Sequence, residues 1–126
     1  MQRVMSIARF RIHPGKADEF AALAEECVRL VRQHDPATLL YEWFINDDRT
    51  ECIAVDSYAT SEAVLAHIRN VGPTMRMLRQ LADVSVELLG SPSPALLEAL
   101  SFRSDGIYAL LHGLGNEGTA RAREAS

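Results

Sequence analysis

The side chain of this sequence that is best placed for acid–base chemistry is His67. It follows Val64 by three residues and directly precedes Ile68, so it borders the apolar side of an expected helix. An imidazole at the edge of an apolar cavity could take a proton from a bound phenol, because imidazole exchanges protons near neutral pH. The structural alternative is a histidine that is hydrogen-bonded inside the core, and the spacing alone favours that alternative.

A second candidate is the carboxyl group of Asp56, which lies between Ala54 and Tyr58 on one face of an expected interior strand. Carboxylates are seldom buried unless they have a charged partner or serve a site. Asp56 therefore either orients a group in a site or pairs with an arginine such as Arg9 or Arg11. The ion pair is the slightly favoured interpretation.

Aromatic residues are few and unevenly distributed, since three of the eight fall between positions 41 and 44. Tyr41 and Trp43 share one face of an expected strand, and Tyr58 shares that face on the neighbouring strand if the hairpin register is symmetrical. These rings could wall a pocket for a flat ligand, although aromatic residues on a buried strand more often belong to the core. The four histidines and two cysteines form no ligand motif, so no metal site is predicted.

Apolar periodicity predicts the elements that carry these candidates, because alternation indicates strands and a spacing of three and four indicates helices. The turn Asp35-Pro36 should end the first helix, since proline restricts the residue before it. Gly72-Pro73 should interrupt the second helix and leave a separate short helical piece. The expected order is strand 4–12, helix 16–34, strand 39–45, strand 51–58, a helix from Ser61 with its short continuation, and a strand that ends at Gly90.

That order over residues 4–89 is a ferredoxin-like βαββαβ arrangement, an α+β fold with an antiparallel sheet and both helices on one face. Leu40 and Phe44 lie on the opposite parity to Tyr41 and Trp43, so both faces of that strand are expected to be buried. Helices can cover only one face. We therefore expect the other face to meet a second copy in a homodimer, as in a dimeric α/β barrel, or the C-terminal extension.

The chain divides into one domain and a C-terminal extension. Residues 1–90 are expected to form the ferredoxin-like domain. Residues 91–115 begin Ser-Pro-Ser-Pro and carry several leucines, so we expect one or two short helices that pack on the domain or on its partner. Residues 116–126 have no large apolar side chain and are expected to be disordered.

Composition restricts the partners and the compartment. The formal charge of -4 disfavours nucleic acid and anionic membrane surfaces. No apolar run approaches the ~20 residues that span a bilayer, and the N-terminus does not look like a signal peptide. Cys27 and Cys52 form no CxxC motif, so a cytoplasmic location is expected.

Three segments carry a family resemblance: FRIHPGKADEF, the YEWF strand, and VDSYATSEAVLAH. Over residues 4 to about 89 the chain resembles the antibiotic biosynthesis monooxygenase (ABM) family of dimeric α/β-barrel proteins. The resemblance implies a ferredoxin-like protomer whose sheet packs on the sheet of a partner. It also implies oxidation of hydroquinones or polyketide phenols by O2 without flavin, metal or haem, and hence no cofactor.

The resemblance also implies roles for particular positions. Asp56 stands where relatives usually have Glu, Tyr58 where they have Trp or Tyr, and His67 where they have a helix histidine. Relatives often have a second histidine where this chain has Gly72. Haem-degrading members have Asn near position 8 and Trp near position 67, whereas this chain has Ala8 and His67, so haem oxygenation is disfavoured.

The leading hypothesis is therefore a cofactor-independent monooxygenase that oxidises a quinol-like or polyketide-like aromatic with O2. His67 would be the base, and Asp56 would orient a donor or tune the histidine. The pocket walls would be Tyr41, Trp43 and Tyr58. Two alternatives stay open: a non-catalytic dimeric module that binds a small aromatic metabolite, which Gly72 favours, and an isomerase or cyclase that needs no O2.

Overall fold

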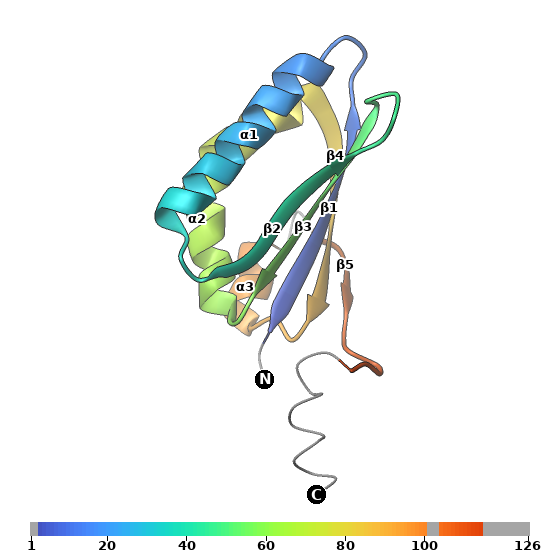
Figure 1. Cartoon of the computed structure of the whole chain (residues 1–126). Helices are drawn as coiled ribbons and strands as arrows, with labels where there is room; N and C mark the ends of the chain where they lie inside the picture. Colours follow the sequence, from blue (N-terminus) through green and yellow to red (C-terminus); the bar gives the residue numbers. More distant parts are fainter. Residues whose placement is uncertain (1–2, 101–103, 115–126) are drawn as a thin grey trace, which may run out of the picture.

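The structure is a computed structural model that describes residues 3–100 and 104–114. It is an α+β fold in which helices lie on one face of a single sheet (Figure 1). The elements in chain order are β1 (Val4–Ile12), α1 (Ala17–His34), β2 (Thr38–Ile45), β3 (Glu51–Tyr58), α2 (Ser61–Leu81), β4 (Ala82–Gly90), α3 (Pro94–Ala99) and β5 (Ser104–Tyr108).

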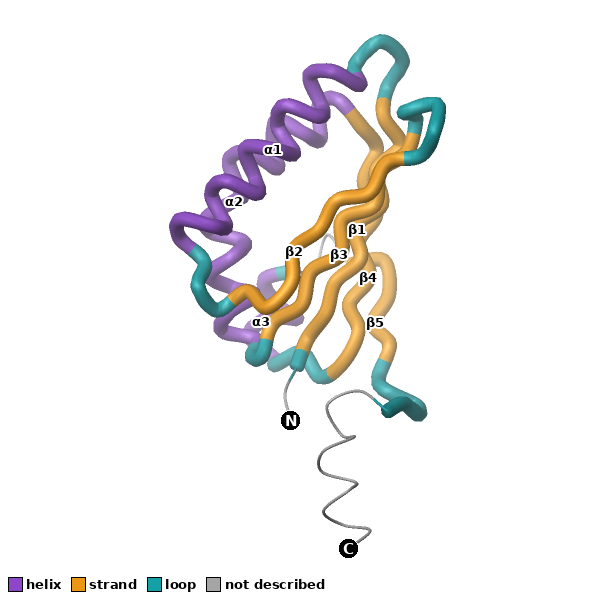
Figure 2. Tube along the Cα trace, in the orientation of Figure 1, coloured by secondary structure: helices purple, strands orange, loops and turns teal. Residues whose placement is uncertain are grey.

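The sheet has the order β2-β3-β1-β4-β5 and is not closed into a barrel (Figure 2). The first four strands pair antiparallel, which confirms the predicted ferredoxin-like arrangement, and β5 adds a parallel strand at the edge of β4. In this register Asp56 on β3 lies opposite Ser6 on β1 and Tyr41 on β2. Side chains at paired positions share a face, so the sheet brings these three residues into one row beneath the helices.

Strand alternation decides which side chains reach the helices. The even-numbered residues of β1 from Val4 to Ile12 are buried, and the odd-numbered ones are partly or fully exposed. The core therefore forms between the inner face of the sheet and α1 and α2, around the stacked rings of Phe10 and Trp43 and the edge of Phe20. This core holds the two layers at the separation that leaves room for a pocket.

The second helix is continuous, contrary to the predicted break at Gly72-Pro73. Pro73 lies inside α2, which runs without interruption from Ser61 to Leu81. An internal proline costs roughly 3 kcal/mol because it removes one hydrogen bond and crowds the preceding turn. Val71 and Leu78, on either side of Pro73, are 3% and 0% exposed, so their packing against the core offsets that cost.

The C-terminal extension, for which the sequence predicts one or two short helices, contains one short helix and one strand. Pro94–Ala99 forms α3, and the Ser93 hydroxyl caps it by accepting from the Leu96 amide. Ser104–Tyr108 instead forms β5, because the free edge of β4 offers backbone hydrogen-bond partners and the Asp105 carboxylate accepts from the Val86 amide. The tail expected to be disordered, 116–126, lies outside the described residues.

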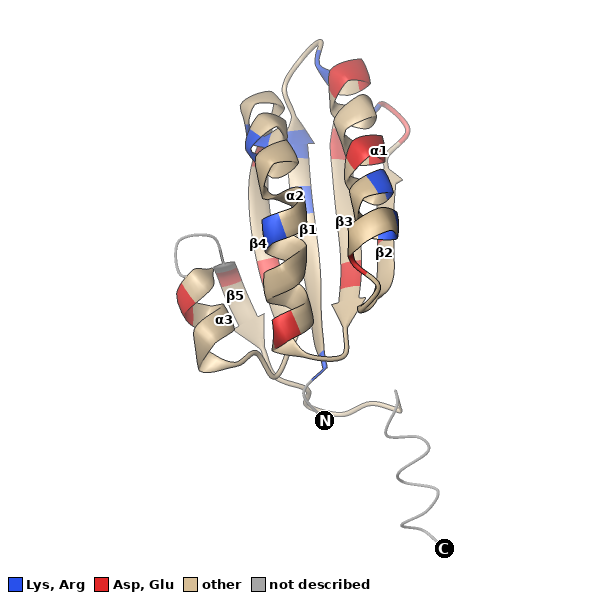
Figure 3. Cartoon of the chain, turned by 90° about the vertical axis from the view of Figure 1, so that its left-hand side faces the viewer, with Lys and Arg blue, Asp and Glu red and all other residues tan. Residues whose placement is uncertain are grey.

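Positions of charged residues on α1 and α2 are visible on the side of the helices that faces away from the sheet (Figure 3). Among the helices that the structure describes, none is long and apolar enough to cross a membrane.

Candidate active site

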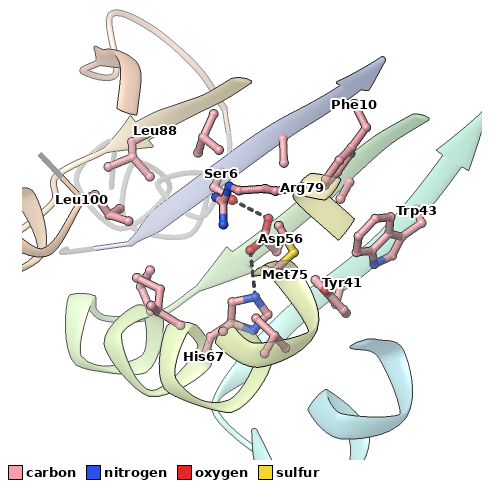
Figure 4. Close-up of a pocket in the computed structure, with 17 residues that line it drawn as sticks. Ser6, Phe10, Tyr41, Trp43, Asp56, His67, Met75, Arg79, Leu88 and Leu100 are labelled. Carbon is pink, nitrogen blue, oxygen red and sulfur yellow. Dashed lines mark hydrogen bonds and ion pairs between the residues drawn. The ribbon is translucent and has the colours of Figure 1, made fainter. Parts of the chain in front are cut away.

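A pocket of about 100 Å³ lies between α2 and the inner face of the sheet. Its wall is mostly apolar, and its polar groups come from four different elements (Figure 4). Those groups are Ser6, Tyr41, Trp43, Asp56, His67 and Arg79. An apolar cavity on which a few polar side chains converge is typical of a small-molecule site.

His67 lies in the wall of this pocket and is 8% exposed. The continuous helix places it one turn below Val71 and facing the sheet, which the apolar spacing of the sequence had indicated. Its two ring nitrogens face two carboxyl groups: Nδ1 lies 2.9 Å from Asp35 Oδ2, and Nε2 lies 3.7 Å from Asp56 Oδ2. The imidazole is therefore held between carboxylates from opposite sides.

Asp56 is 6% exposed and accepts hydrogen bonds from the hydroxyl groups of Ser6 and Tyr58. Burial raises the pKa of Asp56, while the charge of His67 and these two hydrogen bonds act in the opposite direction. Asp56 can thus hold a proton more readily than an exposed aspartate. A carboxyl group and an imidazole in one pocket supply an acid and a base.

The expected ion pair between Asp56 and Arg9 or Arg11 is wrong. Arg9 and Arg11 are odd-numbered residues of β1 and point away from the helices, whereas Asp56 points toward them. Arg9 instead contacts Glu87 on the outer face, with 3.8 Å between Nε and Oε1. The alternation of strand side chains makes the predicted pair impossible.

The three aromatic candidates take two different positions. Tyr41 and Trp43 line the pocket, and the Tyr41 ring lies 5.0 Å from the His67 ring. Tyr58 is fully buried behind the pocket, where its hydroxyl donates to Asp56 and its ring lies 5.4 Å from His67. Burial raises the pKa of Tyr41 and Tyr58 well above the ordinary value, so both hydroxyls stay protonated and can donate.

The sequence patterns did not identify Asp35, Ser6 or Arg79 as residues of the site. The sequence predicts Asp35 only as part of the turn that ends α1, yet its side chain contacts His67, 32 positions away in the sequence. A signal existed for Ser6, because it is a lone polar residue on the buried parity of β1 between Val4 and Ala8. Such a position calls for a hydrogen-bond partner, which Asp56 supplies.

The described residues contain no group of three histidine, cysteine or acidic side chains positioned to hold a metal ion. Cys27 and Cys52 are free and buried, and burial raises the pKa of each thiol to about 11. Neither thiol is therefore ionised to a useful extent near neutral pH.

The fold and the pocket together define a ferredoxin-like α+β protein with a candidate active site between its helices and its sheet. More specifically, the chain belongs to the antibiotic biosynthesis monooxygenase (ABM) family, whose sequence pattern matches residues 3–71. No protein of curated function matches the sequence significantly.

Solved structures share the fold at low sequence identity. MupZ from Pseudomonas fluorescens has a TM-score of 0.75 and 19% identity, and the match covers 90% of this chain and 93% of MupZ. SnoaB from Streptomyces nogalater, a cofactor-independent oxygenase, has a TM-score of 0.63 and 18% identity over 74% of this chain and 96% of SnoaB. An antibiotic biosynthesis monooxygenase has a TM-score of 0.63 and 20% identity over 71% and 99% of the two chains.

Proposed function

We propose that this protein is a monooxygenase that oxidises a phenolic or quinol-like ring with O2 and needs no cofactor. The observation that carries the proposal is His67, whose Nε2 faces an apolar-walled pocket while two carboxyl groups flank the ring. Membership of the ABM family and the shared fold with a cofactor-independent oxygenase support the same reaction class.

The chemistry depends on removing one proton. A phenol with a pKa near ~10 donates an electron poorly until it is ionised, and a phenolate in an apolar pocket can reduce O2 directly. In the overall reaction, phenol plus O2 gives quinone plus water. One oxygen atom enters the ring, the other leaves as water, and the ring loses the four electrons that O2 gains.

The size of the pocket favours one of the two substrate classes. A cavity of roughly 150 Å³ admits benzene, which is a single aromatic ring. The volume of this pocket, about 100 Å³, is of the same order. A monocyclic phenol or quinol therefore fits better than a fused polyketide ring system. Tyr41 and Trp43 would contact its faces and edges.

The first test is oxygen uptake by the purified protein, freed of metal and flavin, with a panel of monocyclic hydroquinones and phenols. We expect one O2 consumed for each quinone formed, with one atom of isotopically labelled O2 in the product. Absence of uptake across the panel, or uptake without incorporation of label, contradicts the proposal.

A second candidate function is acid–base catalysis without O2, as in an isomerase or cyclase. The pocket favours this candidate because a buried carboxyl group with a raised pKa, that of Asp56, lies beside an imidazole base. The two functions differ in their need for O2. Turnover of a ligand under anaerobic conditions would support the second, and tight binding without turnover would indicate a binding module.

We also propose that the chain forms a homodimer through the outer face of its sheet. Within the described residues no helix covers that face (Figure 1). It nevertheless carries apolar side chains, including Phe44 at 55% exposure and the partly buried Ile7 and Ile53. An exposed apolar patch of this kind is typical of an interface.

A reducing compartment such as the cytoplasm would suit the two free thiols.

The dimer is tested by replacing Phe44 with glutamate. Phe44→Glu should weaken dimerisation at least about tenfold, because it places a charge in an interface that excludes water. Light scattering coupled to gel filtration, measured over a range of concentrations, gives the mass. Met77→Glu is the control, since Met77 is 53% exposed on α2. A wild type that is monomeric at all concentrations contradicts the proposal.

A further inference from the structure

Asp35 is a buried carboxyl group whose side chain takes no part in the turn that ends α1. It is 5% exposed and follows the last residue of α1, where the helix dipole disfavours a negative charge. The turn uses only its backbone: the Asp35 amide donates to Val31, and the Asp35 carbonyl accepts from Thr38. Most residue types could provide those two bonds, so the carboxylate requires another explanation.

Both carboxylate oxygens of Asp35 are directed at α2. Oδ1 accepts from the Asn70 side-chain amide at 2.7 Å, and Oδ2 lies 2.9 Å from His67 Nδ1. Asn70 also donates to the backbone carbonyl of His34 at 3.2 Å. The amide of Asn70 thus fixes the orientation of the carboxylate that meets the histidine.

The contact determines which nitrogen of His67 carries the hydrogen. An ionised carboxylate can only accept, so Nδ1 must be the donor. In the neutral ring Nε2 then holds the lone pair, and Nε2 is the nitrogen on the Asp56 side of the ring, within the pocket (Figure 4). The other titratable groups near the ring are the hydroxyls of Tyr41 and Tyr58, and Arg79 lines the same pocket.

We propose that Asp35 is a positioning residue, which holds His67 in the tautomer with hydrogen on Nδ1 and stabilises the imidazolium formed during the reaction. This inference rests on the proposed function of His67 as the base. In the step it supports, the O–H bond of the phenol breaks and an N–H bond forms at Nε2. The electron pair of the O–H bond stays on the phenolate oxygen, and Asp35 keeps its own charge throughout.

Asp35→Asn tests the proposal because it preserves shape and removes the charge. The amide of Asn70 still needs an acceptor, so the new carbonyl oxygen should face Asn70 and the new NH2 group should face His67 Nδ1. An NH2 group can only donate, which forces the hydrogen of the neutral ring onto Nε2. We expect kcat to fall about 100-fold with KM changed less than about threefold, because Nε2 can no longer accept a proton.

The double variant Asp35→Asn, Asn70→Ala separates this role from a merely structural one. Without the Asn70 amide, the side chain at position 35 can turn its oxygen toward Nδ1 and restore the original tautomer. We expect kcat to recover about tenfold relative to Asp35→Asn alone. Asp83→Asn is the matched control, because Asp83 contacts His13 in an exposed pair outside the pocket.

Nitrogen NMR of the His67 ring reads the tautomer in the resting protein without any substrate. We expect hydrogen on Nδ1 in the wild type and in the double variant, and on Nε2 in Asp35→Asn. Hydrogen on Nε2 in the neutral ring of the wild type, or an unchanged tautomer in Asp35→Asn, overturns the proposal. Because this measurement needs no turnover, a wild type that consumes no O2 but shows the expected tautomers contradicts only the proposed reaction.

Discussion

His67→Gln is expected to lower kcat/KM for a phenol about 10³-fold at pH 7. The size follows from the ionisation of the substrate, since a phenol with a pKa near 10 is about one part in 10³ phenolate at that pH. Without the imidazole, only the molecules that are already ionised can react. Steady-state oxygen uptake with wild type and variant measures the ratio.

The pH dependence distinguishes a missing base from a damaged pocket. The residual rate of His67→Gln should rise about tenfold for each pH unit until it approaches the pKa of the phenol. Substituted phenols with a pKa near 7 should lose only a few-fold in rate at pH 7. His13→Gln is the control, because His13 is exposed and lies outside the pocket. A loss of equal size at every pH and with every phenol would remove His67 from the role of base.

Asp56→Asn is expected to lower kcat about 100-fold and to change how stability depends on pH. The loss of rate follows from the position of the carboxyl group, whose Oδ2 lies 3.7 Å from His67 Nε2. A carboxylate there stabilises the imidazolium that forms when the substrate loses its proton, and a neutral amide does so much less.

The effect on stability follows from the raised pKa of Asp56 in the folded protein. Below about pH 3.9, the aspartate is protonated in both the folded and the unfolded chain, so burial carries no penalty from ionisation. As the pH rises above that value the unfolded chain releases its proton, while the folded chain holds it until the raised pKa is passed. The contribution of Asp56 to the free energy of folding therefore becomes less favourable with rising pH.

Chemical denaturation at pH 4, 5.5 and 7 measures this contribution. The free energy of unfolding of Asp56→Asn, relative to wild type, should increase from pH 4 upward and level off once the raised pKa of Asp56 is passed. Asp18→Asn is the control, because Asp18 is exposed and pairs with Arg49 at the surface. A variant that becomes relatively less stable as the pH rises would show that the buried carboxylate is favourable in the folded state.

The order of the first four strands and two long helices could be predicted from sequence, because it depends on local periodicity. Strand side chains alternate with a period of two, and helical side chains recur every 3.6 residues. The same rule placed Asp56 on the face with Ala54 and placed His67 on the apolar side of its helix. These placements need no knowledge of which elements meet in space.

Two local signals gave wrong predictions where packing outweighed them. Gly72-Pro73 has the composition of a helix break, but the buried side chains around it keep α2 continuous. Ile107, Leu110 and Leu111 have helical spacing, yet Ile107 lies in β5 because the edge of β4 was available for pairing. Intrinsic preferences are worth a few kcal/mol at most, so a neighbouring surface can override them.

The sequence by itself therefore determined the α+β fold, the inner face of the sheet, and the two side chains most suited to acid–base chemistry. Only the tertiary structure decided that Asp35 and Asp56 hold His67 between them and that Ser6 donates to Asp56. These contacts join residues 32 and 50 positions apart in the chain. Contacts of that kind depend on strand register and on how helices cross the sheet, which no local pattern of side chains encodes.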